Sequence, residues 1–182
     1  MKKTIAMVLV IVGIFCFAPQ TQAFSFLGYD PQASALYSTA RAAARMEEYD
    51  AAFLSFRDLL ENYPESRYAS RSLFAVGEYY FLNGNYREAA PIFLELVNDD
   101  PEAKNAVFCL AYLLKIAQNN EDQELIAKLE HAIVTFHQLS LVFRESKQFS
   151  YRSSLSRRHK VIYYIDKVEF YVNGELFAQI SY

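Results

Sequence analysis

Histidine and cysteine, the side chains best suited to bind metal ions, are few in this sequence and poorly spaced for a site. The three histidines are His131, His137 and His159, and the first two are six residues apart. That separation places two side chains on different sides of a helix. No Cys-x-x-Cys and no His-Glu-x-x-His motif occurs, so a zinc ion lacks ligands at a workable spacing. We therefore expect no metal site.

Residue patterns for other kinds of catalysis are missing as well. The sequence has no Gly-x-Ser-x-Gly nucleophile elbow and no glycine-rich phosphate loop, and it contains only five glycines. Two acidic pairs, Asp99-Asp100 and Glu121-Asp122, lie at the ends of expected helices, where solvation or capping accounts for them. We expect no catalytic residues, no cofactor and no enzymatic activity.

The first 23 residues have the pattern of a secretory signal peptide. Two lysines follow the initial methionine, an apolar run of 14 residues covers 5–18, and a small residue, Ala23, ends the segment. This run is shorter than the roughly 20 residues that a bilayer span needs. We therefore expect cleavage near Ala23 rather than a permanent anchor, and a periplasmic or secreted protein.

Each of the two cysteines raises a separate question. Cys16 follows Phe15, whereas a lipoprotein signal has a small residue before the modified cysteine, so we do not expect lipidation. Cys109 lies within an apolar helical pattern, and we interpret it as a small buried hydrophobe. A reactive thiol or an intermolecular disulfide is the alternative. A single cysteine after the signal peptide cannot form an internal disulfide.

Composition restricts the partners of the exported chain. Residues 24–182 carry 16 basic and 21 acidic side chains, a net charge of −5, which gives no general attraction to nucleic acid or to an anionic membrane. No second apolar run is long enough to span a bilayer. Most of the 14 tyrosines and 15 phenylalanines fall on helical stripes and should form a core rather than a ligand site.

Two segments of the sequence match each other at a spacing of 37 residues. Within 49–62 and 86–97, apolar residues recur at steps of three and four, as on one face of a helix. Asn83-Gly84-Asn85 can turn the chain between two helices, and Asp30 and Asp100 precede prolines as capping residues do. Each unit is therefore predicted to be a pair of antiparallel helices. The matched pairs are Tyr49 and Tyr86, Ala52 and Ala89, Phe56 and Phe93, and Pro64 and Pro101.

The second unit resembles the tetratricopeptide repeat, in which helical hairpins stack into a solenoid. Gly77 and Ala89 are small where two helices should approach closely. The unit at 31–64 matches well only in its second helix, and a third unit begins at 101–117 and continues with a helix near 123–143. The resemblance implies a mainly α-helical solenoid of two to three repeats that binds other proteins. Its signature positions hold Leu73, Gly77, Tyr80, Gly84, Tyr86, Ala89, Phe93 and Pro101.

One detail of the repeat resembles a particular bacterial type. Tyr63-Pro64-Glu65-Ser66, followed by Ala69, predicts a first helix about one turn longer than in the common repeat. In this the sequence is similar to the periplasmic coordinator associated with the Tol-Pal system and to the repeat lipoprotein of the outer-membrane barrel assembly machinery. No lipoprotein signal and no N-terminal coiled coil are found, so the resemblance implies an envelope role without either specific activity.

The pattern changes after residue 145. Residues 146–160 are rich in arginine, lysine and serine, and we interpret them as a basic linker, with a docking patch for an acidic partner or phosphate as the alternative. Residues 161–182 are rich in β-branched and aromatic residues, and Asn173-Gly174 indicates a hairpin. Two or three strands are not stable by themselves in water. They should therefore cap the last helices, pair with a second copy or extend a partner's sheet. Strands are expected at 168–172 and 175–180 and near 161–165.

These segments divide the chain into four parts. They are a signal peptide (1–23), a tetratricopeptide-like repeat domain (24–145), a basic linker (146–160) and a C-terminal β-hairpin or three-stranded element (161–182).

The first helix of each hairpin should line the concave face of the solenoid. We hypothesise that this groove holds an acidic or C-terminal peptide of another envelope protein, which would make the chain an adaptor or scaffold. The alternative function is a structural subunit that self-associates through the C-terminal hairpin. The groove phenylalanines could also be buried, with the arginines merely solvating the surface. The resemblance places the groove residues at Tyr37, Arg41, Arg45, Arg71, Phe74, Glu78, Phe81, Leu82, Phe108 and Lys115.

Overall fold

The structure is a computed structural model that describes residues 30–143 and 148–181, with only the backbone for 136–143. The predicted signal peptide and its cleavage at Ala23 lie outside the described residues. So do Ser146 and Lys147 of the basic segment and the side chains of Phe136 and His137.

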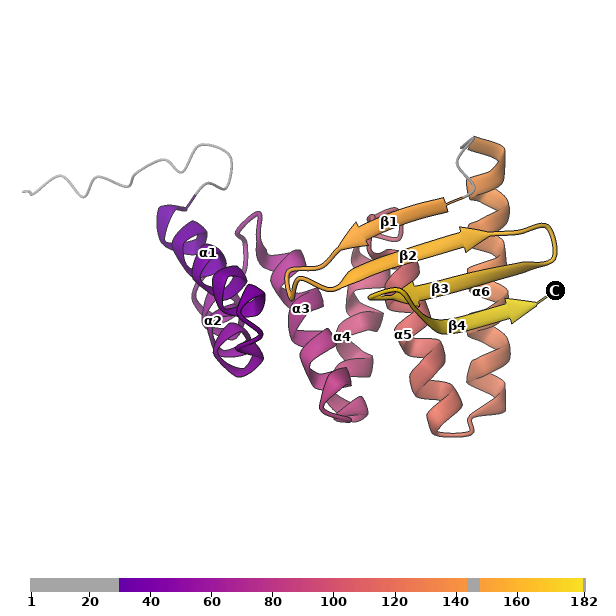
Figure 1. The fold of residues 1–182 in the computed structure, drawn as a ribbon, viewed down its shortest axis with the longest axis horizontal. Helices are drawn as coiled ribbons and strands as arrows, with labels where there is room; N and C mark the ends of the chain where they lie inside the picture. The colour runs from indigo at the N-terminus through magenta and orange to yellow at the C-terminus, as the bar shows by residue number, and fades with distance from the viewer. Residues whose placement is uncertain (1–29, 144–147, 182) are drawn as a thin grey trace, which may run out of the picture.

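In the described residues, six helices form three successive hairpins, and a four-stranded antiparallel sheet follows them (Figure 1). This architecture confirms the predicted helical-hairpin repeats with a C-terminal β element. The helices are α1 (Pro31–Arg45), α2 (Tyr49–Asn62), α3 (Ala69–Leu82), α4 (Tyr86–Asp99), α5 (Ala106–Asn119) and α6 (Gln123–Phe143). The strands are β1 (Gln148–Arg152), β2 (Arg158–Tyr163), β3 (Lys167–Val172) and β4 (Glu175–Ser181).

The 37-residue repeat is visible in the helix boundaries. Helices α2 and α4 begin at Tyr49 and Tyr86, and α3 and α5 begin at Ala69 and Ala106. Close packing explains the glycine of the repeat, because a Cβ atom at Gly77 would lie 2.9 Å from Cε1 of Phe93. The small residue therefore lets α3 approach α4.

The starts of the first helices differ from our prediction. Residues 64–68 and 101–105 form turns rather than an extra helical turn, because hydrogen bonds such as Ala69 N to Ser66 O (2.9 Å) close short loops. Helix α3 is thus no longer than α2 or α4. Asp30 does cap α1, accepting from the backbone N–H of Gln32, whereas Asp100 caps only a turn.

The linker prediction for 146–160 was wrong. This segment contains β1 and the beginning of β2, and the two strands pair with Tyr151 opposite His159. In β1, Phe149 and Tyr151 alternate with exposed polar residues, which is the period-2 pattern of a half-buried strand. The arginines and serines between the aromatic residues concealed that pattern.

The remaining strands confirm the predicted hairpin. Asn173 and Gly174 connect β3 to β4 with φ angles of 54° and 93°, and a two-residue turn with both φ angles positive matches the twist of antiparallel strands. Asn173 also ties the turn to β2, since its Oδ1 accepts from the backbone N–H of Arg158 at 2.9 Å.

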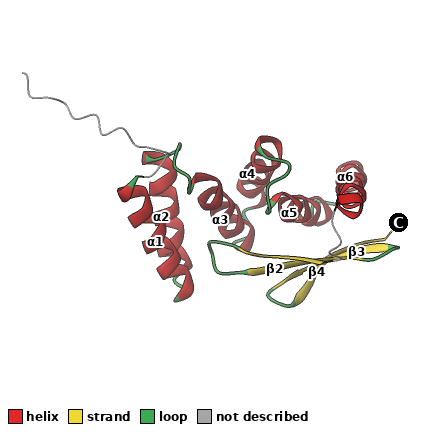
Figure 2. Cartoon of the chain, turned by 90° about the horizontal axis from the view of Figure 1, so that it is seen from above, coloured by secondary structure: helices red, strands yellow, loops and turns green. Residues whose placement is uncertain are grey.

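The sheet lies against α3 and α5, while α4 lies on the other side of these helices (Figure 2). Aromatic pairs join the two layers: Phe74 with Tyr151 (5.6 Å between ring centroids), Phe81 with Phe177 (5.7 Å) and Phe108 with Phe170 (6.4 Å). Of the three expected arrangements for the tail, the structure therefore has the one in which the strands cover the chain's own helical stack.

Candidate partner-binding site

The sheet occupies much of the concave surface on which we expected a partner peptide. Phe74, Glu78 and Phe108 are buried, and Phe81 is half-buried against Phe177. These four groove residues contact the chain's own strands. The phenylalanines are therefore part of the core between stack and sheet, as in the second interpretation of the groove.

Three groove residues lie near the ends of their helices. Arg45 is the exposed last residue of α1, Leu82 is the exposed last residue of α3, and Lys115 is half-buried on α5. None of the three lines the cleft that contains the remaining predicted residues.

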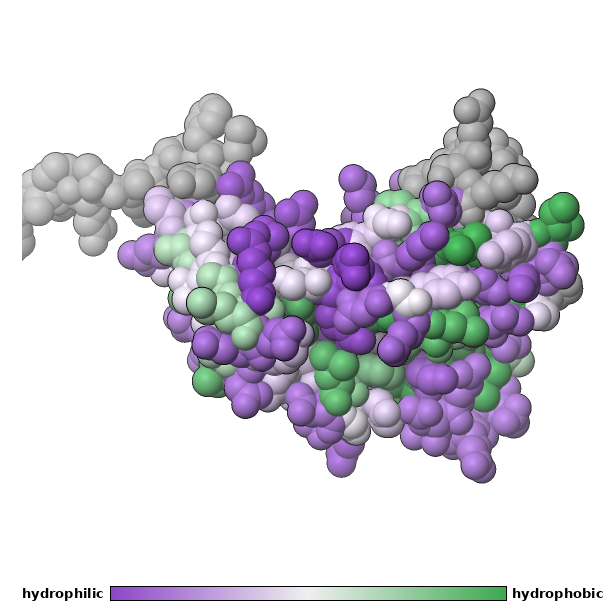
Figure 3. Space-filling model, in the orientation of Figure 1, coloured by the Kyte–Doolittle hydropathy of each residue, from purple (hydrophilic) through white to green (hydrophobic). Residues whose placement is uncertain are grey.

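The remaining three groove residues, Tyr37, Arg41 and Arg71, come together in a cleft of about 360 Å³. Its other walls are Lys104, from the turn before α5, and residues 149–154, from β1 and the turn after it. We call this site the basic cleft. Figure 3 shows strongly hydrophilic side chains gathered between the α1–α2 hairpin and the sheet, where this cleft lies.

Positive charge dominates the basic cleft. Arg41, Arg71, Lys104 and Arg152 line it, and no aspartate or glutamate does. In the part of the chain that the structure describes, none of these four cations has a carboxylate within 4.0 Å. The protein as a whole is acidic, with a formal net charge of −3. The positive charge of the basic cleft is therefore a local feature and does not reflect the overall composition.

The predicted groove residues include only two of the four cations. Lys104 belongs to a turn that we had assigned to a helix. Arg152 belongs to the segment that we had interpreted as a linker, with a docking patch for an acidic partner or phosphate as the alternative. The alternation of Phe149 and Tyr151 in β1 was the available signal for Arg152. No local pattern brings either residue next to α1.

The walls of the basic cleft are held by buried contacts. The Tyr37 hydroxyl lies 2.8 Å from Oγ of Ser154, and this buried hydrogen bond joins α1 to the turn after β1. The Tyr37 ring stacks on Tyr68 with centroids 4.5 Å apart, and the Arg41 guanidinium lies 5.8 Å from the Tyr37 centroid. Leu155, in the same turn, is fully buried. These contacts fix the positions of the cleft walls.

A polar cluster lies deeper, between α3, α5 and β2. The Tyr112 hydroxyl donates to Oε1 of Glu78 at 3.0 Å, and its oxygen lies 3.0 Å from Nε2 of His159. His159 Nε2 is also 3.1 Å from Glu78 Oε1. All three side chains are at most 1% exposed, which leaves a solute no access. We interpret the cluster as a set of structural contacts that hold the sheet against the helical stack.

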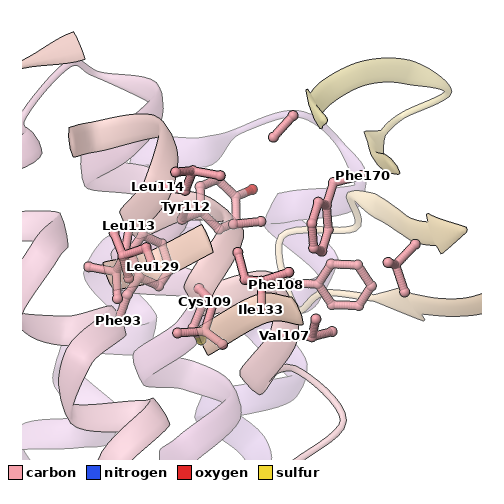
Figure 4. Close-up of a cluster of buried hydrophobic side chains, with 14 of the residues drawn as sticks. Phe93, Val107, Phe108, Cys109, Tyr112, Leu113, Leu114, Leu129, Ile133 and Phe170 are labelled. Atoms are coloured by element: carbon pink, nitrogen blue, oxygen red, sulfur yellow. The ribbon is translucent and has the colours of Figure 1, made fainter. Parts of the chain in front are cut away.

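Cys109 lies in the core one helical turn before Tyr112, near Ile133 (Figure 4). Burial, followed by the nearby negative charge of Glu78, raises the pKa of the Cys109 thiol well above its usual range. A thiol in this state is a poor nucleophile because the thiolate is the reactive form. The structure therefore agrees with a small buried hydrophobe at this position.

The described part of the chain contains neither a metal-binding cluster nor a membrane-spanning helix. Among the side chains that the structure describes, no group of three or more histidine, cysteine, aspartate or glutamate residues could hold a metal ion. No helix there has the length and apolar character needed to span a membrane.

Comparison with known proteins supports the repeat assignment. No curated protein gives a significant match to the chain. Residues 34–66 match the family model described as tetratricopeptide repeat, which corresponds to α1, α2 and the turn that follows. Tetratricopeptide repeats serve as surfaces for protein binding. The match and the three stacked hairpins together support a tetratricopeptide-repeat protein that acts as a protein–protein interaction module.

Proposed function

We propose that this protein is an exported adaptor that binds an acidic segment of a partner protein in the basic cleft. The single observation that supports this proposal is the convergence of Arg41, Arg71, Lys104 and Arg152 without a neighbouring carboxylate. Four like charges held in one concave site repel one another, and a polyanionic ligand relieves that repulsion.

The side chains of the basic cleft suit carboxylates in particular. Arginine forms bidentate, charge-assisted hydrogen bonds with carboxylate groups, and the cleft has three arginines. Tyr37, Phe149 and Tyr151 add aromatic surface beside them. A segment that combines aspartate or glutamate with a few apolar residues, or that ends in a free carboxylate, would match both features.

The location of this activity follows from one expectation of the sequence. The pattern of residues 1–23 is that of a signal peptide. We therefore place the adaptor in the periplasm or outside the cell, with a protein of an envelope assembly as its partner.

Self-association is the second candidate function. Strand β4 forms one edge of the sheet, and its Leu176 is 56% exposed. An exposed edge with an apolar side chain can pair with a second copy. Mass measurement of the purified exported chain separates the two candidates, because a monomer at micromolar concentration contradicts the self-associating subunit.

A charge-reversal experiment tests the adaptor function. Fluorescence anisotropy would measure binding of a labelled, blocked glutamate-rich peptide to the wild type and to the Arg41→Glu/Arg71→Glu variant. We expect binding at least about tenfold weaker in the variant, without a lower melting temperature. We also expect the affinity of the wild type to fall with added salt.

A matched control distinguishes the effect of losing the basic cleft from the effect of a changed net charge. Arg57→Glu/Arg87→Glu makes the same charge change on exposed positions of α2 and α4, and it should retain most of the affinity. A lysine-rich peptide of equal length should not bind the wild type. Equal loss of binding in both double variants, or equal binding in the cleft variant and the wild type, would remove the basic cleft from consideration.

A further inference from the structure

The basic cleft runs along the free edge of β1. Six consecutive residues, 149–154, line it, although successive side chains of a strand point to opposite faces of the sheet. An unbroken run of lining residues therefore means that the backbone edge itself borders the cleft. Strand β1 is the first strand in the order β1-β2-β3-β4, so this edge has no partner strand among the described residues.

The hydrogen-bond pattern shows which backbone groups face the cleft. The N–H of Ser153 donates to the carbonyl of Arg157 at 3.0 Å, so Ser153 turns its backbone groups toward β2. Along an antiparallel strand, the backbone N–H and C=O groups of successive residues point alternately toward and away from the neighbouring strand. Ser150 and Arg152 consequently direct their N–H and C=O groups away from β2 and toward the basic cleft.

Positive charge flanks this edge on both faces of the sheet. On the outer face, Arg152 lies directly opposite Arg158 and Ser150 lies opposite Lys160. Arg158 and Lys160, together with Arg152 and Tyr171, line a second hollow of about 740 Å³. The edge therefore runs between the cations of the basic cleft and those of the outer face. Like charges on an edge oppose pairing with a second copy of β1.

We propose that the partner's acidic segment binds in an extended conformation and adds to the sheet as a fifth strand beside β1. This inference rests on the proposed function and specifies its mode of recognition. The backbone groups of Ser150 and Arg152 supply main-chain hydrogen bonds, as in other cases of strand addition. Acidic side chains on one face of the added strand meet Arg41, Arg71 and Lys104, and those on the other face meet the outer cations.

The experiment uses a blocked peptide of about six residues, the length of an ordinary strand, built from glutamate and threonine. A second peptide has the same sequence with two consecutive central amides N-methylated. Because alternate residues face β1, this pair removes one pairing N–H in either register and keeps the charge. We expect the methylated peptide to bind about tenfold more weakly.

A variant of the protein tests the main-chain hydrogen bonding between β1 and the peptide by changing β1. Ser150→Pro removes the outward N–H, and proline is tolerated on an edge strand where that group faces away from the sheet. It should weaken binding by a similar factor, whereas Ser150→Ala should not. By NMR, amide exchange at positions 150 and 152 should slow when the unmodified peptide binds the wild type.

The outcomes separate the two proposals. Equal binding of both peptides, with unchanged exchange at 150 and 152, overturns strand addition and leaves an acidic ligand held by side chains alone. Failure of the unmodified peptide to bind the wild type at low salt overturns the acidic ligand together with strand addition. If Ser150→Pro does not fold, the methylated peptide and the exchange measurement still decide the question.

Discussion

Nε2 of His159 lies 3.1 Å from Oε1 of Glu78, and the two side chains are 1% and 0% exposed. His159 comes from β2 and Glu78 from α3, so the contact joins the sheet to the second hairpin. The rings of Phe74 and Phe108 enclose His159, with centroids 5.7 and 5.2 Å from it. A polar pair in such surroundings requires both members, because either one alone would be a buried group without its partner.

Loss of His159 should therefore destabilise the protein strongly. We expect His159→Leu to lower the free energy of unfolding by about 3 kcal/mol or more, since Glu78 would keep only the hydrogen bond from Tyr112. Urea denaturation followed by circular dichroism measures this loss. The double variant Glu78→Leu/His159→Leu should lose less than the sum of the two single variants. Additive losses would show that the pair is not coupled.

The close approach of α3 and α4 at Gly77 leads to a second expectation. Gly77→Val would place side-chain atoms against Phe93 and Ile92, where a Cβ atom alone would already be 2.9 and 3.0 Å from them. We expect a loss of about 1–3 kcal/mol in thermal or urea unfolding. Ser70→Val places the same side chain at an exposed position of the same helix and serves as the control. Helix propensity alone would not destabilise Gly77→Val, because glycine has a lower helix propensity than valine. A similar loss in both variants would contradict the packing explanation.

The thiol of Cys109 should be unreactive in the folded protein. Its raised pKa and complete burial predict reaction with Ellman's reagent at least about a hundredfold slower than that of an exposed thiol. Full reaction should follow in concentrated guanidinium. Gln123→Cys in a Cys109→Ala background supplies the exposed reference. Rapid reaction of native Cys109 would restore the reactive-thiol interpretation.

A pH dependence is expected on the outer face of the sheet. Hydrogen bonds from Lys167 Nζ (2.8 Å) and the Tyr171 hydroxyl (2.7 Å) lower the pKa of Glu169. A carboxyl with a lowered pKa in the folded state stabilises the fold above its ordinary pKa. This contribution is lost as the pH falls through the folded-state value.

Carbon-detected NMR of labelled glutamate measures the titration of Glu169. Lys167→Met should raise the pKa of Glu169 toward its ordinary value and flatten the acid limb of the stability curve. Lys128→Met removes an exposed pair on α6 and serves as the control. A Glu169 titration unchanged by Lys167→Met would contradict the assignment of the shift.

The helical part of the fold could be predicted because its determinants are local and repeated. Tyr49 and Tyr86 begin equivalent helices, and the 37-residue spacing made that equivalence visible. The strands were harder to predict where charge obscured the pattern. Tyr151 faces the core, but its neighbours Ser150 and Arg152 are exposed, and their composition suggested a loop.

The candidate site was only partly predictable because half of it depends on how the tail folds back. Tyr37, Arg41 and Arg71 follow from the repeat, since their positions in the first helices set the direction of their side chains. Their meeting with Arg152 follows from the packing of β1 over α3, a long-range contact that no short pattern encodes. The same packing buries Phe74 and Phe108, which had appeared available to a partner.

The hydrogen bond between Tyr37 and Ser154 connects residues 117 positions apart in the chain. Residues of α1 and α3 supply one wall of the basic cleft, and residues 149–154 supply the other. A chain truncated before β1 would therefore present the arginines of α1 and α3 without the strand edge. Under the proposed mode of binding, such an incomplete copy does not compete for the ligand.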